Sequence, residues 1–237
     1  MLDLIIKNGQ CYIDGQLKEV NVAIKDRKIH KIGEISEEAK ETIKAEGQTV
    51  LPGCIDTQTH FREPGSTDTE DLHSGSRAAV AGGITSVFEM PNTNPPTSTK
   101  VEFQKKLDLA KNRMYCNYAF YFGATADNGN ELADLEKLEG CCGIKLFAGS
   151  STGNLLVADE EDIDTVFKNS SKVVAVHSED EEILNKNKKL IKNGDVHSHP
   201  IWRSVECAMS STRRIVRIAE KHNKKTHVLH ITTKEEI

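Results

Sequence analysis

The stretch Leu51-Pro-Gly-Cys-Ile-Asp-Thr-Gln-Thr-His-Phe-Arg-Glu-Pro-Gly65 decides the fold class of this chain. An apolar run over residues 49–55 leads into a polar end, and Pro64-Gly65 stops the strand. Because side chains alternate between the two faces of a strand, one face should carry four polar groups: Asp56, Gln58, His60 and Arg62. Functional groups gathered at a strand end, just before a loop, are typical of parallel-barrel enzymes. Taken alone, the pattern is better explained as a buried strand with a polar exit.

Further strands and helices alternate after this stretch. A capping box at Thr67-Asp-Thr-Glu70 predicts a helix that runs to Gly82-Gly83, and Thr99 begins another. Apolar runs predict five more strands, over residues 84–90, 114–122, 143–147, 172–177 and 226–231. Six strands alternating with helices predict a parallel α/β architecture. Apolar strands with polar C-terminal ends favour a (β/α)8-type TIM barrel over a doubly wound sheet, which would also want a Gly-rich turn after strand one.

Residues 1–50 follow a different pattern. Short alternating runs, with Asn8-Gly9 and Asp14-Gly15 as hairpin turns, predict a small antiparallel sheet. The charged segment 36–46 is predicted to be a surface turn of helix or a loop. We therefore expect two domains, a small β domain over residues 1–50 and an α/β barrel over residues 51–237.

Composition excludes several classes of protein. The net charge of −5 gives no reason to expect a nucleic-acid partner, and the chain has no apolar run of about 18 residues that could span a membrane. The apolar run at the N-terminus is too short for a signal peptide. The 6 cysteines show no CxxC spacing and do not resemble a disulfide framework. These features favour a protein of the reducing cytoplasm.

The ends of the predicted strands carry residues that suit a metal site. Strand one ends in Gln58 and His60, strand four carries Lys145, and strands five and six end in His177 and His230. In a barrel these ends converge on one mouth, and imidazoles at converging strand ends suit zinc. Any one of these histidines is better explained as an ordinary core or surface residue. Three of them at equivalent places in successive units are harder to dismiss.

Lys145 has apolar neighbours in the sequence. Burial would lower the pKa of its amine, and a neutral buried lysine can react with carbon dioxide to give an anionic carbamate able to bridge two metals. The alternative is a lysine that extends its ammonium group to the rim of the barrel.

The chain resembles the amidohydrolase superfamily and, within it, is most similar to the dihydroorotases. The motifs that carry the resemblance fall in order along nearly the whole chain: residues 51–65, Met90-Pro-Asn-Thr93, Gly143-Ile-Lys-Leu-Phe147, Gly149-Ser-Ser-Thr-Gly-Asn154, Val176-His-Ser-Glu179 and His227-Val-Leu-His-Ile-Thr232. The resemblance also implies that residues 1–50 are the N-terminal part of a composite β-sandwich.

The resemblance implies a zinc centre of one or two ions and a reaction. His60 would bind the first metal, Lys145 would be carbamylated and bridge both, and His177 and His230 would bind the second. Two further residues, Arg62 and Asn92, match those that hold the substrate carboxylate. The implied reaction is the reversible conversion of dihydroorotate and water to N-carbamoyl-L-aspartate in pyrimidine biosynthesis. Arg62 favours this substrate over those of hydantoinases and allantoinases, because a guanidinium group binds a carboxylate with two hydrogen bonds.

Two departures from the family pattern place catalysis by this chain in question. Gln58 stands where the family has the first histidine of an HxH pair, and an amide is a poorer zinc ligand than an imidazole. The barrel is expected to be truncated after about six βα units, without the aspartate that serves the family as general base. The second-metal residues Lys145, His177 and His230 are all present, so that site is expected to be the more intact.

Two classes of function therefore remain. The first is a dihydroorotase-type hydrolase acting on a small molecule. The second is a non-catalytic homologue or fragment that self-associates or docks against an enzyme such as aspartate transcarbamoylase. Two other histidine segments are not expected to bind metal: His197-Ser-His199 should be exposed or belong to a substrate loop, and His227 should face the surrounding helices because its strand parity is opposite to that of His230.

Overall fold

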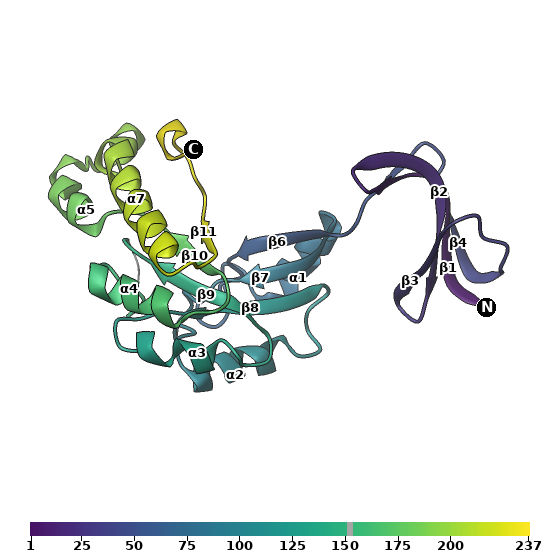
Figure 1. Cartoon of the computed structure of the whole chain (residues 1–237), viewed down its shortest axis with the longest axis horizontal. Helices are drawn as coiled ribbons and strands as arrows, with labels where there is room; N and C mark the ends of the chain where they lie inside the picture. The colour runs from purple at the N-terminus through teal and green to yellow at the C-terminus, as the bar shows by residue number, and fades with distance from the viewer. Residues whose placement is uncertain (151–153) are drawn as a thin grey trace. The chain divides into compact units, whose positions relative to one another are not determined.

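The computed structural model describes residues 1–150 and 154–237. It divides into two compact units, residues 1–54 and residues 55–237, which we describe separately. Figure 1 shows the small β unit at the N-terminal end of the colour scale and the α/β unit over the remainder.

The N-terminal unit is a five-stranded sheet in which β3, β2, β1 and β4 are neighbours in that order and β5 also pairs with β1. Its strands are β1 (Leu2–Ile13), β2 (Gln16–Lys25), β3 (Lys28–Gly33), β4 (Ala39–Lys44) and β5 (Thr49–Val50). The predicted hairpin at Asp14-Gly15 joins β1 to β2, and both residues have the positive φ that such a turn needs, 52° and 80°.

Three predictions for this unit were wrong. Asn8-Gly9 does not form a hairpin turn but lies inside β1, where the register with β2 shifts between Ile6 and Gly9. The sheet is mixed rather than antiparallel, because β4 and β5 both run parallel to β1. The segment 36–46 contains strand β4 rather than a helical turn or a loop. β4 is almost entirely exposed at the end of the sheet order, and edge strands commonly carry charged side chains, so its lysines and glutamate hid the strand pattern.

The second unit contains a parallel half-barrel, as the sequence predicted. Its six-stranded sheet has the order β11-β10-β9-β8-β7-β6, so each strand lies beside its neighbours along the chain (Figure 1). The strands are β6 (Cys54–Thr59), β7 (Ile84–Glu89), β8 (Asn117–Gly123), β9 (Cys141–Phe147), β10 (Val174–His177) and β11 (Thr226–Val228). The pairings from β7 through β11 are all parallel. A strand order without reversal is that of an incomplete TIM barrel and differs from that of a doubly wound sheet.

The strands alternate with α-helices: α1 (Leu72–Ala81), α2 (Lys100–Ala110), α3 (Leu132–Leu135), α4 (Glu160–Asn169), α5 (Glu181–Asn187), α6 (His199–Trp202) and α7 (Val205–Lys221). Thr99 caps α2 as predicted, but the box predicted at Thr67 was wrong. The N-cap of α1 is Asp71, whose side chain accepts from the backbone of Ser74 at 2.6 Å, while the Ser74 hydroxyl accepts from Asp71 N. The chain at Thr67 is instead folded into turns, as in the bond from Thr69 N to Ser66 O.

Two hydrophobic clusters lie on opposite faces of the six-stranded sheet. The outer one packs the sheet against the helices and includes Phe103, Phe120, Ile144, Val176 and Ile215. The inner one is smaller and contains Met90, Tyr121, Ala175 and Leu229. Membership of one cluster or the other therefore shows which face each strand residue occupies. Among the described residues, no helix is both long and apolar enough to cross a membrane.

Candidate active site

A β-bulge determines the direction of Lys145. On β9, Cys141 belongs to the outer cluster, and so do Ile144 and Leu146. Strict alternation from Cys141 would place Lys145 outward as well, but the register with β8 shifts by one residue at Cys142. Because a bulge changes the parity of the residues that follow it, Lys145 lies between outward-facing Ile144 and Leu146 and points to the inner face.

The Lys145 amine is deeply buried. The residue is 1 % exposed, and its Nζ lies 4.1 Å from the centroid of the Phe147 ring. Nζ also donates a hydrogen bond of 3.3 Å to the backbone oxygen of Leu146. Burial lowers the pKa of Lys145 well below its ordinary value. Burial thus favours the neutral, nucleophilic form of the amine, which carbamate formation requires.

His177 and His230 face one another at the ends of β10 and β11. Nδ1 of His177 lies 3.0 Å from Nε2 of His230, and the other ring nitrogen of His177, Nε2, lies 2.6 Å from the Glu179 carboxylate. A carboxylate only accepts, so the hydrogen between His177 Nε2 and Glu179 belongs to His177, which fixes the orientation of the ring with Nδ1 toward His230. Desolvation lowers the pKa of His230, and the charges of His177 and Lys145 lower it further.

The backbone of His230 explains how it reaches this position. β11 ends at Val228, and His230 has a φ of 41°, outside the strand region. The prediction that His227 faces the helices was wrong, because His227 is in register with Ala175 of the inner cluster. The parity argument assumed a continuous strand, and the left-handed residue breaks that alternation.

His60 and Arg62 lie beyond the end of β6, which closes at Thr59, so the predicted single strand face was wrong for these two residues. Desolvation lowers the pKa of His60 to about 4, and the charges of Arg62 and Lys145 act in the same direction, while the nearby Asn92 side chain opposes them. His60 is thus neutral at physiological pH and lies within electrostatic range of Lys145. Arg62 is exposed and has a φ of 62°.

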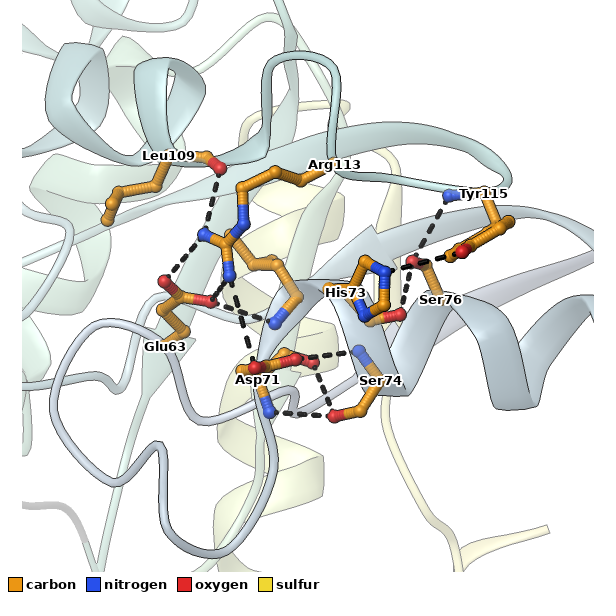
Figure 2. Close-up of polar contacts among 9 residues, drawn as sticks. Glu63, Asp71, His73, Ser74, Ser76, Leu109, Arg113 and Tyr115 are labelled. Atoms are coloured by element: carbon orange, nitrogen blue, oxygen red, sulfur yellow. Dashed lines mark hydrogen bonds and ion pairs between the residues drawn. The ribbon is translucent and has the colours of Figure 1, made fainter.

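The loop that carries Arg62 is anchored by the network in Figure 2. Glu63 is buried and accepts two hydrogen bonds from the Arg113 guanidinium, at 2.8 and 3.1 Å. Its Oε2 also accepts from the backbone of Leu72, the first residue of α1, at 2.9 Å. Arg113 reaches toward the N-cap Asp71 as well, at 4.0 Å. These contacts fix the loop to two helices directly beside the exposed arginine.

Gln58 lies on β6 and is partly buried, and its backbone N–H donates to Asp56 Oδ1 at 2.9 Å. Asn92 follows β7 and is also partly buried, and among the described residues its Oδ1 has no hydrogen-bond partner. An unpartnered buried polar atom beside His60 is a site for a ligand to bind.

A cavity of about 380 Å³ opens beside the two facing histidines. Its lining contains His177 and His230 together with Glu179, His199 and Arg203. His199 is the first residue of α6, so it does not lie in the loop where the sequence predicted it. The sequence reasoning did not single out Glu179 or Arg203 as functional. Glu179 could have been predicted, because it lies two residues after His177 in the motif Val176-His-Ser-Glu179. Nothing in the sequence around Arg203 indicates a function.

Glu179 connects this cavity to the loop after β9. Burial works to raise the pKa of Glu179, but the hydrogen bond from His177 and the charge of Arg203 outweigh it and leave the pKa lowered. Arg203 donates to Glu179 through one terminal nitrogen and to Ser150 through the other. Of the predicted motif 149–154, residues 151–153 lie outside the described residues.

The spacing of His177 and His230 is compatible with two ligands of one metal ion. Two tetrahedral zinc ligands with bonds of about 2.0–2.1 Å place their nitrogens roughly 3.3 Å apart, close to the separation of the two facing imidazoles. Within residues 1–150 and 154–237, no three His, Cys, Asp or Glu side chains are grouped closely enough to hold a metal by themselves. A metal at this position therefore needs a donor from the lysine, which a carbamate would supply.

Residues 49–237 match the sequence profile of the amidohydrolase family. The chain belongs to this family. A curated dihydroorotase from Methanosarcina mazei is 33 % identical over 243 residues, covering 100 % of this chain and 53 % of the relative. An Escherichia coli allantoinase is 32 % identical over 245 residues, covering 98 % of this chain and 54 % of the relative. The chain thus spans about half the length of the curated relatives it matches.

Solved structures of this amidohydrolase's relatives share its fold. The L-hydantoinase from Arthrobacter aurescens matches with a TM-score of 0.92 and 26 % identity, over 100 % of this chain and 54 % of that one. A dihydropyrimidinase from Brevibacillus agri matches with a TM-score of 0.88 and 24 % identity, over 100 % and 53 %. The relatives thus include dihydroorotase, allantoinase and hydantoinase, and their similarity alone does not choose among these activities.

Proposed function

We propose that this chain is a unit of a zinc-dependent, dihydroorotase-type cyclic amidohydrolase. The observation that supports the proposal is that Arg62, Asn92 and the buried Lys145 all lie close enough to His60 to act on its pKa, and that His60 is neutral at physiological pH. A cationic fork and a free amide beside a metal-binding cluster suit a ring amide substrate that also bears a carboxylate.

The chain's own residues would each contribute a distinct function. Lys145, as its carbamate, would hold zinc together with His177 and His230. Glu179 would keep the proton on Nε2 of His177 and so present Nδ1 to the ion. When bound, the metal supplies an activated water and polarises the carbonyl that is attacked.

Arg62 would select the substrate among the three activities found in the relatives. Dihydroorotate and N-carbamoyl-aspartate carry a carboxylate at the position that a guanidinium group can bind, whereas hydantoin and allantoin have none. The hydrogen bonds of Glu63 to Arg113 and to the backbone of Leu72 fix the loop that carries Arg62. Substrate binding therefore does not have to supply all of the entropy cost of ordering the guanidinium group. A hydantoinase- or allantoinase-type activity remains the alternative within this class.

One observation favours a second, non-catalytic function. Gln58 occupies a position at which an imidazole would be the better zinc ligand, and it lies two residues before His60 on the same strand end. A chain with a weakened first-metal site could act as a structural homologue that associates with itself or with a pathway enzyme such as aspartate transcarbamoylase.

The experiment combines metal analysis, a carbamate signal and turnover. Purified chain incubated with zinc and ¹³C-bicarbonate should bind zinc and show a carbamate carbon resonance by NMR, and Lys145→Met should lose both.

Dihydroorotate hydrolysis should be faster than hydantoin or allantoin hydrolysis, and Arg62→Met should remove that preference. Arg213→Met, on the exposed face of α7, is the matched control. Zinc binding with neither turnover nor dihydroorotate binding would favour the structural function, whereas equal zinc binding by Lys145→Met would refute the ligand assignment.

A further inference from the structure

A buried pair of opposite charges contacts the backbone near the predicted carboxylate-binding residues, and the proposed chemistry does not use it. Glu89 is the last residue of β7, Lys106 lies in the middle of α2, and the two form an ion pair with side chains 1 % and 0 % exposed. Lys106 also lies 5.2 Å from the centroid of the Phe120 ring.

Each member of this pair also binds backbone near the site. Glu89 Oε1 accepts from the backbone N–H of Phe61 at 3.3 Å, and Phe61 stands between His60 and Arg62 in the sequence. Lys106 Nζ donates to the backbone oxygen of Met90 at 2.9 Å, two residues before Asn92. The ion pair is therefore a connection between the loop after β6 and the loop after β7.

Two backbone hydrogen bonds join the same two loops. Met90 N donates to Thr59 O at 3.0 Å, and Asn94 N donates to Pro64 O at 2.9 Å. The segments that carry Arg62 and Asn92 are thus joined by two backbone hydrogen bonds and by the Glu89–Lys106 ion pair. The ion pair also links them to α2, which carries Lys106. An apolar pair could fill the same space at less desolvation cost, but it could not bind these two backbone groups.

We propose that Glu89 and Lys106 are positioning residues that set the spacing between Arg62 and Asn92 and thereby the affinity of the site for a carboxylate ligand. The inference rests on the proposed function. Displacement by about 1 Å of groups that hold a substrate can cost two orders of magnitude in rate, so loss of the connection should weaken binding measurably.

The test compares Lys106→Met with Lys105→Met, an exposed neighbour on α2 whose salt bridge is at the surface. Calorimetry would measure the binding of N-carbamoyl-L-aspartate and of dihydroorotate to the zinc-loaded full chain. We expect Lys106→Met to weaken binding roughly tenfold or more, with zinc content unchanged and Lys105→Met at the wild-type value. Arg62→Met reports on the proposed function itself. If it weakens binding and Lys106→Met does not, only the inference fails.

A second measurement does not depend on any ligand. Amide hydrogen exchange should show the Phe61 N–H protected in the wild type and exchanging at least about tenfold faster in the double variant Glu89→Met, Lys106→Met, which removes both charges and leaves no side-chain acceptor for the Phe61 N–H. Amides of β9 should be unaffected, which shows that the variant is folded. Unchanged exchange at Phe61 would overturn the inference. Failure of the unaltered chain to bind either ligand would overturn the proposed function and the inference together.

Discussion

Replacement of Lys106 by methionine should destabilise the α/β unit in a manner that depends on pH. The change keeps an unbranched side chain of similar length but leaves Glu89 fully buried without its cation. Burial already raises the pKa of Glu89 to about 7, even though the charge of Lys106 and its hydrogen bond act to lower it. Without Lys106 the pKa of Glu89 in the folded state must be higher still.

The direction of the pH dependence follows from this shift. In the unfolded chain Glu89 has an ordinary carboxyl pKa, and it is raised in the folded state, so the folded variant binds one more proton between the two values. Its stability is therefore complete below the unfolded pKa and is lost as the pH rises toward the folded pKa, by up to about 1.4 kcal/mol per pH unit. In the wild type the free energy of unfolding stops falling near pH 7, the folded-state pKa of Glu89. In the variant this pKa is higher, so the free energy of unfolding continues to fall above pH 7.

The magnitude can be bounded at both ends of the range. Near pH 5.5, Glu89 of the variant is neutral, and the loss should be about 1 kcal/mol, the value of one hydrogen bond such as that from Lys106 to Met90. Near pH 8.5, the loss should approach the roughly 3–5 kcal/mol typical of a broken buried ion pair.

Urea unfolding followed by tryptophan fluorescence is a suitable assay, because the only tryptophan of the chain, Trp202, lies in the α/β unit. Lys105→Met should leave the midpoint unchanged at both pH values. Adding Glu89→Gln to Lys106→Met should abolish the excess pH dependence, because an amide does not titrate. A loss that is the same at pH 5.5 and pH 8.5 would refute the reasoning, and so would a double variant with the same pH dependence as the single one.

Three further changes probe other parts of the unit. Gln58→His should raise the bound zinc per chain, measured by atomic emission after dialysis, and unchanged metal content would contradict the assignment of the first-metal position. Glu179→Gln should weaken zinc binding by about 10- to 100-fold, as loss of the carboxylate that orients a ligand histidine does, and a competition titration with a chelator would show it. Gly143→Ala places a Cβ 2.6 Å from the backbone oxygen of Val173 and should cost roughly 1–3 kcal/mol in urea unfolding, whereas Gly82→Ala, whose nearest contact would be at 3.5 Å, should be tolerated.

The barrel could be predicted because each of its strands can be identified from a short stretch of neighbouring residues. Apolar runs with polar ends mark each strand, and the strand predicted over 84–90 is observed as Ile84–Glu89. The exposed strand β4 was missed for the opposite reason, since a strand at the end of a sheet order can be stabilised by pairing without an apolar pattern of its own.

The directions of the site residues could not be obtained from strand parity. Lys145 points inward because of the register shift at Cys142, and His230 reaches His177 because its backbone leaves the strand region. Both features depend on the pairing partner or on a single φ value, and neither has a signature in the residues themselves. The grouping of strand ends was nevertheless a sound expectation, since parallel strands bring their carboxyl ends to one edge whatever the local details are.

The structure divides the site into two parts that are held by different means, and this division bears on Gln58. Lys145, His177 and His230 depend on β9 to β11 and on the Glu179 carboxylate. Arg62 and Asn92 depend on two loops fixed by buried carboxylates, Glu63 and Glu89.

Gln58 belongs to neither set of supports, and its position on β6 would affect only the proposed first-metal site. Having glutamine instead of histidine at position 58 should therefore reduce turnover, while binding of the second metal and of a carboxylate should be retained. It follows that turnover alone cannot distinguish a weakened enzyme from a structural homologue. Substrate binding by a zinc-loaded chain can do so, because a weakened enzyme would still bind a carboxylate ligand through Arg62 and Asn92, whereas a purely structural function requires no such binding.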